Sequence, residues 1–277
     1  MVVDPTFKNS TVYNYVNNIL NDFEEEFNIK ILYAVESGSR AWGFDNKESD
    51  YDIRFIYKKP VEEYLILNQK RRDVIDYNDL KGWFYDYPLD FSGWDISKAL
   101  FLHYKSNPDL REWLLSDYIY KGNADSLFND LPTFDKDTVL YHYGSIVNNA
   151  WNKYVIGHEG MGKRVTKRYL YCIRCILSYI LLKEHNISDV PINIFDLLAY
   201  FEEDNNIIHN ILLDDIYQLI DYYKNSCENY LSEESIFNLS SFIDKYNKTI
   251  GKSIFHKTGF KNLNSYNQRF QELILYG

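Results

Sequence analysis

The hydrophobic and polar positions along the chain change their period about one third of the way along it. Residues 29–36 form an apolar, β-branched run of strand length, and 51–57 alternate in steps of two, so both segments are predicted to be strands. Residues 88–96 predict a further strand that leads directly into a helix, and a weaker strand is expected near 72–77. Residues 10–27 carry apolar side chains on one stripe and predict an amphipathic helix before the first strand.

The rest of the chain has a helical period. Asn107-Pro108-Asp109 predicts a helix start, because Asn caps, Pro suits the first helical position and Asp favours the helix dipole. Further helices are expected at 136–156, 163–184, 192–203, 206–224, 233–248 and 262–276. The pattern therefore predicts an α+β chain with a mixed part, 1–130, and an all-helical part, 131–277.

Composition and charge narrow the function classes. The 277 residues are 45% hydrophobic and 25% charged, as in ordinary folded proteins, and the net charge of −10 disfavours a general nucleic-acid coat. Between positions 153 and 174, however, six basic residues stand against one acidic residue, which gives this segment +5 and the remainder −15. The basic residues are Lys153, Lys163, Arg164, Lys167, Arg168 and Arg174. A nucleic-acid substrate at this segment is compatible with the acidic total.

The three cysteines do not predict a metal or redox centre. Cys172 and Cys175 form a C-x-x-C inside an apolar helical stretch with no second Cys or His pair nearby, which favours buried thiols. Together with Cys227 they make an odd count, and the N-terminus does not resemble a signal peptide. No apolar run has the length of a membrane span. We expect a cytoplasmic protein with no membrane partner.

The stretch VESGSRAWGFDNKESDYDIRFIY, 35–57, carries the strongest candidate chemistry. Gly38 permits a tight turn with close backbone approach, and Ser39 offers a hydroxyl and an N–H. In the following strand Asp50, Asp52 and Arg54 fall on one face, where two carboxylates repel each other unless a cation lies between them. Taken singly, the carboxylates also fit an exposed polar edge and the Gly-Ser pair fits an ordinary turn. Their combination predicts a phosphate-binding turn beside a divalent-metal site.

These motifs resemble the signature of the DNA polymerase β-like nucleotidyltransferase superfamily. The wording GSRAWG…SDYDIRFIY, followed by DFSGWDISKAL and NPDLREWL, resembles in particular the RNA repair pathway DNA polymerase β family. The resemblance covers about residues 30–120 and, more loosely, the helix at 163–182. It implies a polymerase β-like catalytic domain, with a mixed sheet and helices, followed by an all-helical domain.

The resemblance also implies a third carboxylate on a neighbouring strand. Asp90 and Asp95 are both candidates, since each lies between apolar residues in PLDFSGWDISK, and we favour Asp95 at the strand end. A competing interpretation of Asp95 is an N-cap of the helix that starts at Ile96.

By the same resemblance, Asp50, Asp52 and Asp95 would hold two Mg²⁺ ions, with Mn²⁺ as an alternative, and Gly38 and Ser39 would hold the β and γ phosphates of an NTP. Further candidate triphosphate contacts are Arg40, Arg54, Lys163, Lys167 and Tyr171. Arg40 and Arg54 fit equally well as ion-pair partners of a carboxylate, and the lysines fit a solvated cationic face.

The implied reaction moves a nucleoside monophosphate from an NTP to a hydroxyl group and releases pyrophosphate. The family resemblance favours an RNA 3′ end as the acceptor, in repair or modification of RNA or tRNA. The alternatives are the same transfer to a protein or small molecule (AMPylation) and a catalytically inactive nucleotide-binding protein. The last is disfavoured because every candidate carboxylate is present.

Overall fold

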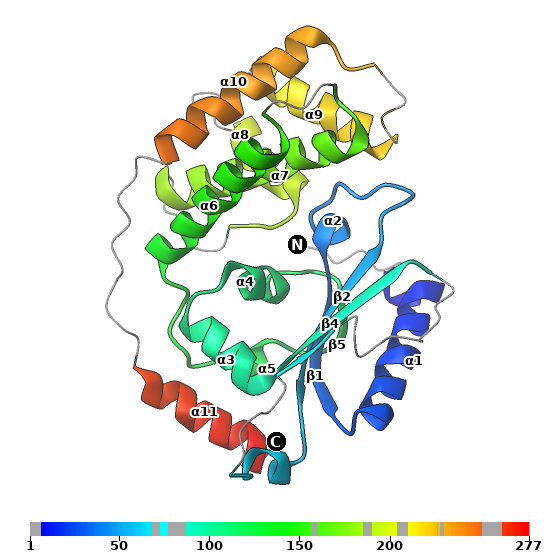
Figure 1. Ribbon diagram of the computed structural model, residues 1–277, viewed down its shortest axis with the longest axis vertical. Coiled ribbons are helices and arrows are strands. Elements are labelled where there is room, and N and C mark those ends of the chain that lie inside the picture. Colours follow the sequence, from blue (N-terminus) through cyan, green and yellow to red (C-terminus); the bar gives the residue numbers. More distant parts are fainter. Residues whose placement is uncertain are drawn as a thin grey trace. The chain divides into compact units, whose positions relative to one another are not determined.

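A computed structural model describes residues 7–67, 73–76, 87–156, 160–184, 190–203, 210–225, 227, 230–250 and 262–276. The chain divides into two compact units (Figure 1). The first unit comprises Met1–Ala41, Asp50–Phe134 and Gly259–Gly277, and the second comprises Trp42–Ser49 and Asp135–Thr258. A short segment of the second unit therefore interrupts the first one in sequence.

The first unit is built on a five-stranded sheet with strand order β3-β4-β2-β1-β5. The strands are β1 (Lys30–Ser37), β2 (Tyr51–Lys58), β3 (Val74–Ile75), β4 (Leu89–Asp95) and β5 (Ile119–Gly122). β2 and β4 pair in parallel, and the other pairs are antiparallel. The central strands are apolar because helices cover both faces of the sheet.

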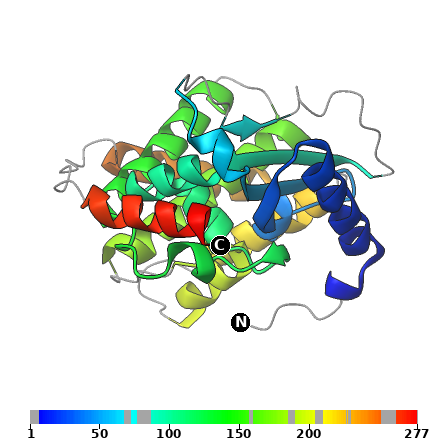
Figure 2. The same ribbon diagram turned by 90° about the horizontal axis from the view of Figure 1, so that it is seen from below.

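Helices of the first unit cover both faces of this sheet (Figures 1 and 2). They are α1 (Thr11–Glu26), α2 (Gly38–Ala41), α3 (Ile96–Tyr104), α4 (Pro108–Leu114), α5 (Asp125–Phe128) and α11 (Leu263–Leu275), with 3₁₀ turns at Phe7–Asn9 and Val61–Tyr64. α1 packs Leu20 and Phe23 onto one face of the sheet, in one core with Phe55. α3, α4 and α11 form a separate core with the other face, to which Leu100 and Tyr266 contribute.

The second unit is helical. It contains α6 (Lys136–Tyr154), α7 (Lys163–Glu184), α8 (Ile194–Glu203), α9 (Asn210–Lys224) and α10 (Glu233–Ile250). α7 is its central helix, and nearly every residue from Tyr169 to Leu182 is buried. Cys172 and Cys175 belong to this buried stretch as free thiols, and burial raises the pKa of the Cys172 thiol, which confirms the structural interpretation of the C-x-x-C.

The predicted α+β class is confirmed, and most of the predicted elements are present. Ser10 caps α1, and Asn107 caps α4 with Pro108 at the first helical position. The prediction missed the short elements β5 and α5, which are too short for a period to develop. Residues 72, 77 and 206–209 of the predicted elements lie outside the described residues.

The C-terminal helix corrects the grouping expected from the sequence. α11 follows the helical segments in sequence, yet it packs with the first unit. Tyr266 is 3% exposed, and its hydroxyl lies 2.9 Å from Nδ1 of His103 on α3. Arg269 donates hydrogen bonds to the carbonyls of Ser126 and Leu127. Sequence order alone could not predict these long-range contacts.

Across the described ranges, none of the helices combines the length and the apolar character that crossing a membrane requires.

Candidate active site

The Gly-Ser turn joins the end of β1 to α2. Gly38 has a φ of +64°, and a Cβ atom at this position would lie 1.9 Å from Oδ2 of Asp52. The Asp52 carboxylate therefore packs directly against the Gly38 backbone, and no side chain fits between them. Ser39 follows in α2 and is 2% exposed. The turn permits close approach to its backbone, and the group that approaches it is the carboxylate of a candidate metal ligand. A phosphate contact at this turn stays a prediction.

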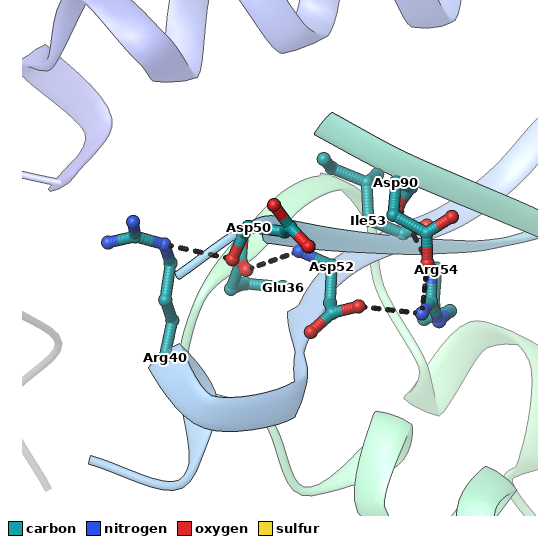
Figure 3. Close-up of polar contacts among 7 residues, drawn as sticks. All are labelled: Glu36, Arg40, Asp50, Asp52, Ile53, Arg54 and Asp90. Carbon is teal, nitrogen blue, oxygen red and sulfur yellow. Dashed lines mark hydrogen bonds and ion pairs between the residues drawn. The ribbon is translucent and has the colours of Figure 1, made fainter. Parts of the chain in front are cut away.

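Asp52 and Asp90 lie side by side, directly opposite each other in the parallel pairing of β2 with β4. Arg54 is on the same face of β2 and stands between them (Figure 3). Its Nη2 atom is 2.8 Å from Oδ1 of Asp52 and 2.7 Å from Oδ2 of Asp90, and Nη1 donates to the carbonyl of Asp90. The side chains of Arg54, Asp52 and Asp90 are 18%, 26% and 48% exposed, so solvent reaches the cluster.

Asp95, the favoured third carboxylate, is placed elsewhere. It is the last residue of β4, five positions beyond Asp90, and lies opposite Tyr57 rather than Asp52. Asp95 is fully buried, caps α3 by accepting from the N–H and hydroxyl of Ser97, and accepts from the hydroxyl of Tyr64. The geometry therefore replaces Asp95 by Asp90 as the third carboxylate candidate, because the parallel register brings Asp90 level with Asp52.

Asp50 and Arg40 lie at the other edge of the site. Asp50 is exposed and immediately precedes β2, and its carbonyl accepts a hydrogen bond from Nε of Arg40 at 3.3 Å (Figure 3). The guanidinium of Arg40 lies 3.7 Å from the centre of the Tyr51 ring. Contacts of both side chains with a nucleotide or a metal stay predictions.

Glu36 contributes to the candidate site although the sequence did not predict it as a site residue. It is 2% exposed near the end of β1, where Oε1 accepts from the N–H of Asp52 at 2.8 Å and Oε2 accepts from the hydroxyl of Tyr120 at 2.6 Å. Burial raises the pKa of Glu36 to about 7, although both hydrogen bonds oppose the shift. Glu36 thus fixes the backbone of Asp52. The available signal was a carboxylate in an otherwise apolar strand directly before the Gly-Ser turn.

The remaining candidates belong to the second unit. Lys163, at the start of α7, forms an ion pair with Glu48, and the Tyr171 ring lies 5.1 Å from the ring of Trp42. Lys167 is exposed. Their role in triphosphate binding stays a prediction.

Both partners, Trp42 and Glu48, belong to the segment 42–49, here called the linker, which connects the Gly-Ser turn with β2 in the chain. Arg174 is fully buried with its guanidinium 4.5 Å from the Trp42 ring, so it is part of the core of the second unit. The cationic face expected on α7 is therefore smaller than the sequence suggested.

Two comparisons with known proteins show what the chain is similar to. The family model of the RNA repair pathway DNA polymerase β family matches residues 12–247, and the chain belongs to this family. The family is one of polymerase β-like nucleotidyltransferases. The chain is also 40% identical over 173 residues to the uncharacterized protein YcgL of Bacillus subtilis (strain 168). That alignment covers 60% of this chain and 61% of the relative, so it spans less than two thirds of the relative's length.

Proposed function

We propose that the protein is a Mg²⁺-dependent nucleotidyltransferase that moves a nucleoside monophosphate from an NTP to a hydroxyl group of an RNA 3′ end and releases pyrophosphate. The observation that carries the proposal is the placement of Asp52 and Asp90 side by side, with Asp52 packed on the backbone of Gly38. The turn for which we propose phosphate binding and a pair of carboxylates thus meet at one place.

The residues present fit a magnesium site. Carboxylate oxygens are the donors that Mg²⁺ prefers, and the guanidinium of Arg54 shows that the space between Asp52 and Asp90 accepts a cation. In the described part of the chain no group of three His, Cys, Asp or Glu side chains converges as a ready metal cluster. Asp50, Asp52 and Asp90 are the residues that would hold the metal. When bound, Mg²⁺ would neutralise charge on the phosphates and on the attacking oxygen.

The chain's own groups would divide the remaining tasks. Gly38 and Ser39 would place the phosphates through backbone N–H groups and the Ser39 hydroxyl. Asp90 is the most exposed member of the Asp52–Arg54–Asp90 cluster and would accept the proton of the attacking hydroxyl. Glu36 would hold the Asp52 backbone in place through its hydrogen bond.

An RNA end is the acceptor that the observations favour. The family to which the chain belongs is described by its association with RNA repair. Arg164 and Lys167 on the first turns of α7 are exposed and offer cationic contacts to a phosphate backbone. Transfer to a protein or a small molecule uses the same site and is an outcome that the following experiment distinguishes.

The experiment offers each of four α-³²P-labelled NTPs with Mg²⁺ to wild type and to the Asp52→Asn and Asp90→Asn variants. Total RNA, cell protein and small metabolites serve as separate acceptors. We expect label on RNA with wild type and a strong loss of label in both variants. The surface variant Asp244→Asn should show no loss, because Asp244 forms only an exposed ion pair with Lys248 on α10 among the contacts described for it. Label on protein or on small molecules instead of RNA would identify that class as the acceptor and reject RNA. Equal labelling by wild type and both site variants would contradict the site.

A further inference from the structure

In the cluster of Asp52, Arg54 and Asp90, the guanidinium of Arg54 is a cation that pairs with both carboxylates. Nη2 of Arg54 contacts one carboxylate oxygen of each aspartate, at 2.8 Å and 2.7 Å. Nη1 donates to the main-chain carbonyls of Ile53 and Asp90, at 3.2 Å and 3.0 Å. One end of the guanidinium is thus held by carboxylates and the other by backbone (Figure 3). The two anchors differ in kind, because only the carboxylates can also bind a divalent metal tightly.

The position of Nη2 excludes a metal ion between the same oxygens. An Mg²⁺ ion bound to both would lie about 2.1 Å from each oxygen. Nη2 is already in hydrogen-bond contact with both oxygens, so an ion bound to both would have to displace this nitrogen. A dication would also be repelled by the guanidinium charge at such a short distance. Metal and Arg54 must therefore compete for the two carboxylates.

We propose that Arg54 is a displaceable counterion of the metal site. In the absence of metal, it holds Asp52 and Asp90 together and cancels their mutual repulsion. On metal binding, Nη2 releases both carboxylates, while Nη1 retains backbone carbonyls about which the side chain turns. Arg54 thereby lowers the affinity for free metal, and so acts as a positioning residue. This inference rests on the proposed function, because it takes Asp52 and Asp90 as metal ligands.

The test measures Mn²⁺ binding without nucleotide, by the EPR signal of free Mn²⁺, for wild type, Arg54→Gln and Arg54→Lys. We expect Arg54→Gln to bind Mn²⁺ about fivefold more tightly, since two partly exposed ion pairs no longer have to be broken. Arg54→Lys keeps the charge, but its single nitrogen cannot contact both carboxylates and also the backbone carbonyls of Ile53 and Asp90, so we expect an intermediate affinity. Lys121→Gln is the matched control, because it removes the same charge from a pair with Glu24 in the same unit.

Thermal unfolding gives a second readout. Without metal, Arg54→Gln should melt at a lower temperature than wild type, because its two carboxylates repel each other. Mn²⁺ should raise the melting temperature of this variant by more than it raises that of wild type, in line with the tighter binding. An unchanged or weaker Mn²⁺ affinity in Arg54→Gln would overturn the proposal.

Failure of this inference is distinguishable from failure of the proposed function. Asp52→Asn is introduced into both wild type and Arg54→Gln. If Mn²⁺ binding does not depend on Asp52 in either background, the metal site itself is wrong. If binding depends on Asp52 but Arg54→Gln does not tighten it, the metal site stands and only the counterion role of Arg54 is rejected.

Discussion

Gly38 is the residue at which the turn and the carboxylates come closest. Its φ of +64° is unfavourable for other residues, and an added Cβ would overlap with the Asp52 carboxylate. We expect Gly38→Ala to lower the free energy of unfolding by about 1–3 kcal/mol from backbone strain alone. We also expect it to weaken Mn²⁺ binding by displacing Asp52. Denaturant unfolding measures the free energy, and the EPR signal of free Mn²⁺ measures the affinity.

The control for this substitution is Gly162→Ala, because a Cβ at Gly162 meets no atom within 4 Å. It should leave Mn²⁺ binding unchanged. A Gly38→Ala variant with wild-type stability and metal affinity would show that the close packing of Gly38 and Asp52 is not required.

Asp95 is expected to act on stability rather than on metal binding. Replacing it by Ala removes the N-cap of α3 and the acceptor of the Tyr64 hydroxyl. The expected loss is about 1–2 kcal/mol in the free energy of unfolding. Mn²⁺ affinity should not change. Loss of Mn²⁺ binding in a folded Asp95→Ala protein would restore Asp95 as a ligand and argue against Asp90.

Glu36 gives the first unit a defined pH dependence. Its pKa is raised from 4.5 to about 7, so the folded state holds the proton more tightly than the unfolded chain. The resulting stabilisation is fully present below pH 4.5 and is lost as the pH rises through about 7. Relative to Glu36→Gln, metal-free wild type should lose up to about 3 kcal/mol over this range. Unfolding free energies of the two proteins that stay parallel from pH 5 to pH 8 would contradict the shifted pKa.

Among single residues, the sequence predicted those whose proximity depends on local spacing. Gly38 and Asp52 belong to one short motif, and their spacing was enough to place them together. The choice between Asp90 and Asp95 depended on the parallel register of β2 with β4, which pairs residues 38 positions apart. Local spacing carries no information about such a register, so the sequence alone could not show that Asp90, rather than the favoured Asp95, lies opposite Asp52.

At the scale of elements, α11 depends on contacts made by its buried side. Tyr266 is packed among α3 residues and its hydroxyl contacts His103, whereas Tyr276 at the end of the same helix is 86% exposed. We expect Tyr266→Ala to cost about 3 kcal/mol in the free energy of unfolding. Tyr276→Ala should stay within about 0.5 kcal/mol of wild type. Equal effects of the two substitutions in denaturant unfolding would show that α11 is not docked through Tyr266.

Elements were predictable where they were long enough to show a period. The stripe of α1 and the apolar length of β1 are visible in the sequence, as are the caps at Ser10 and Asn107. β5 has four residues and gains its stability from pairing with β1, which lies far away in sequence. Such an element is defined by its partner and not by its own pattern.

At the scale of the whole molecule, the linker 42–49 is a segment of the second unit that interrupts the first unit in the sequence. It joins Ala41 of the Gly-Ser turn to Asp50, and both ends belong to the first unit. Between them, Phe44 is fully buried and its ring lies 6.4 Å from that of Tyr223, so the linker is part of the core of the second unit. The two motifs of the candidate site are therefore connected through a segment whose packing depends on the helices.

If Asp52 and Asp90 form a metal–nucleotide site, equilibrium binding of an NTP must depend on both carboxylates and on Mg²⁺. Each of the four NTPs is titrated into wild type, Asp52→Asn, Asp90→Asn and the surface control Asp244→Asn, with and without Mg²⁺. We predict that wild type and the control bind at least one NTP in a Mg²⁺-dependent manner, and that each site variant loses about tenfold or more in affinity. No NTP binding by wild type, or equal Mg²⁺-dependent binding by all four proteins, would contradict the account.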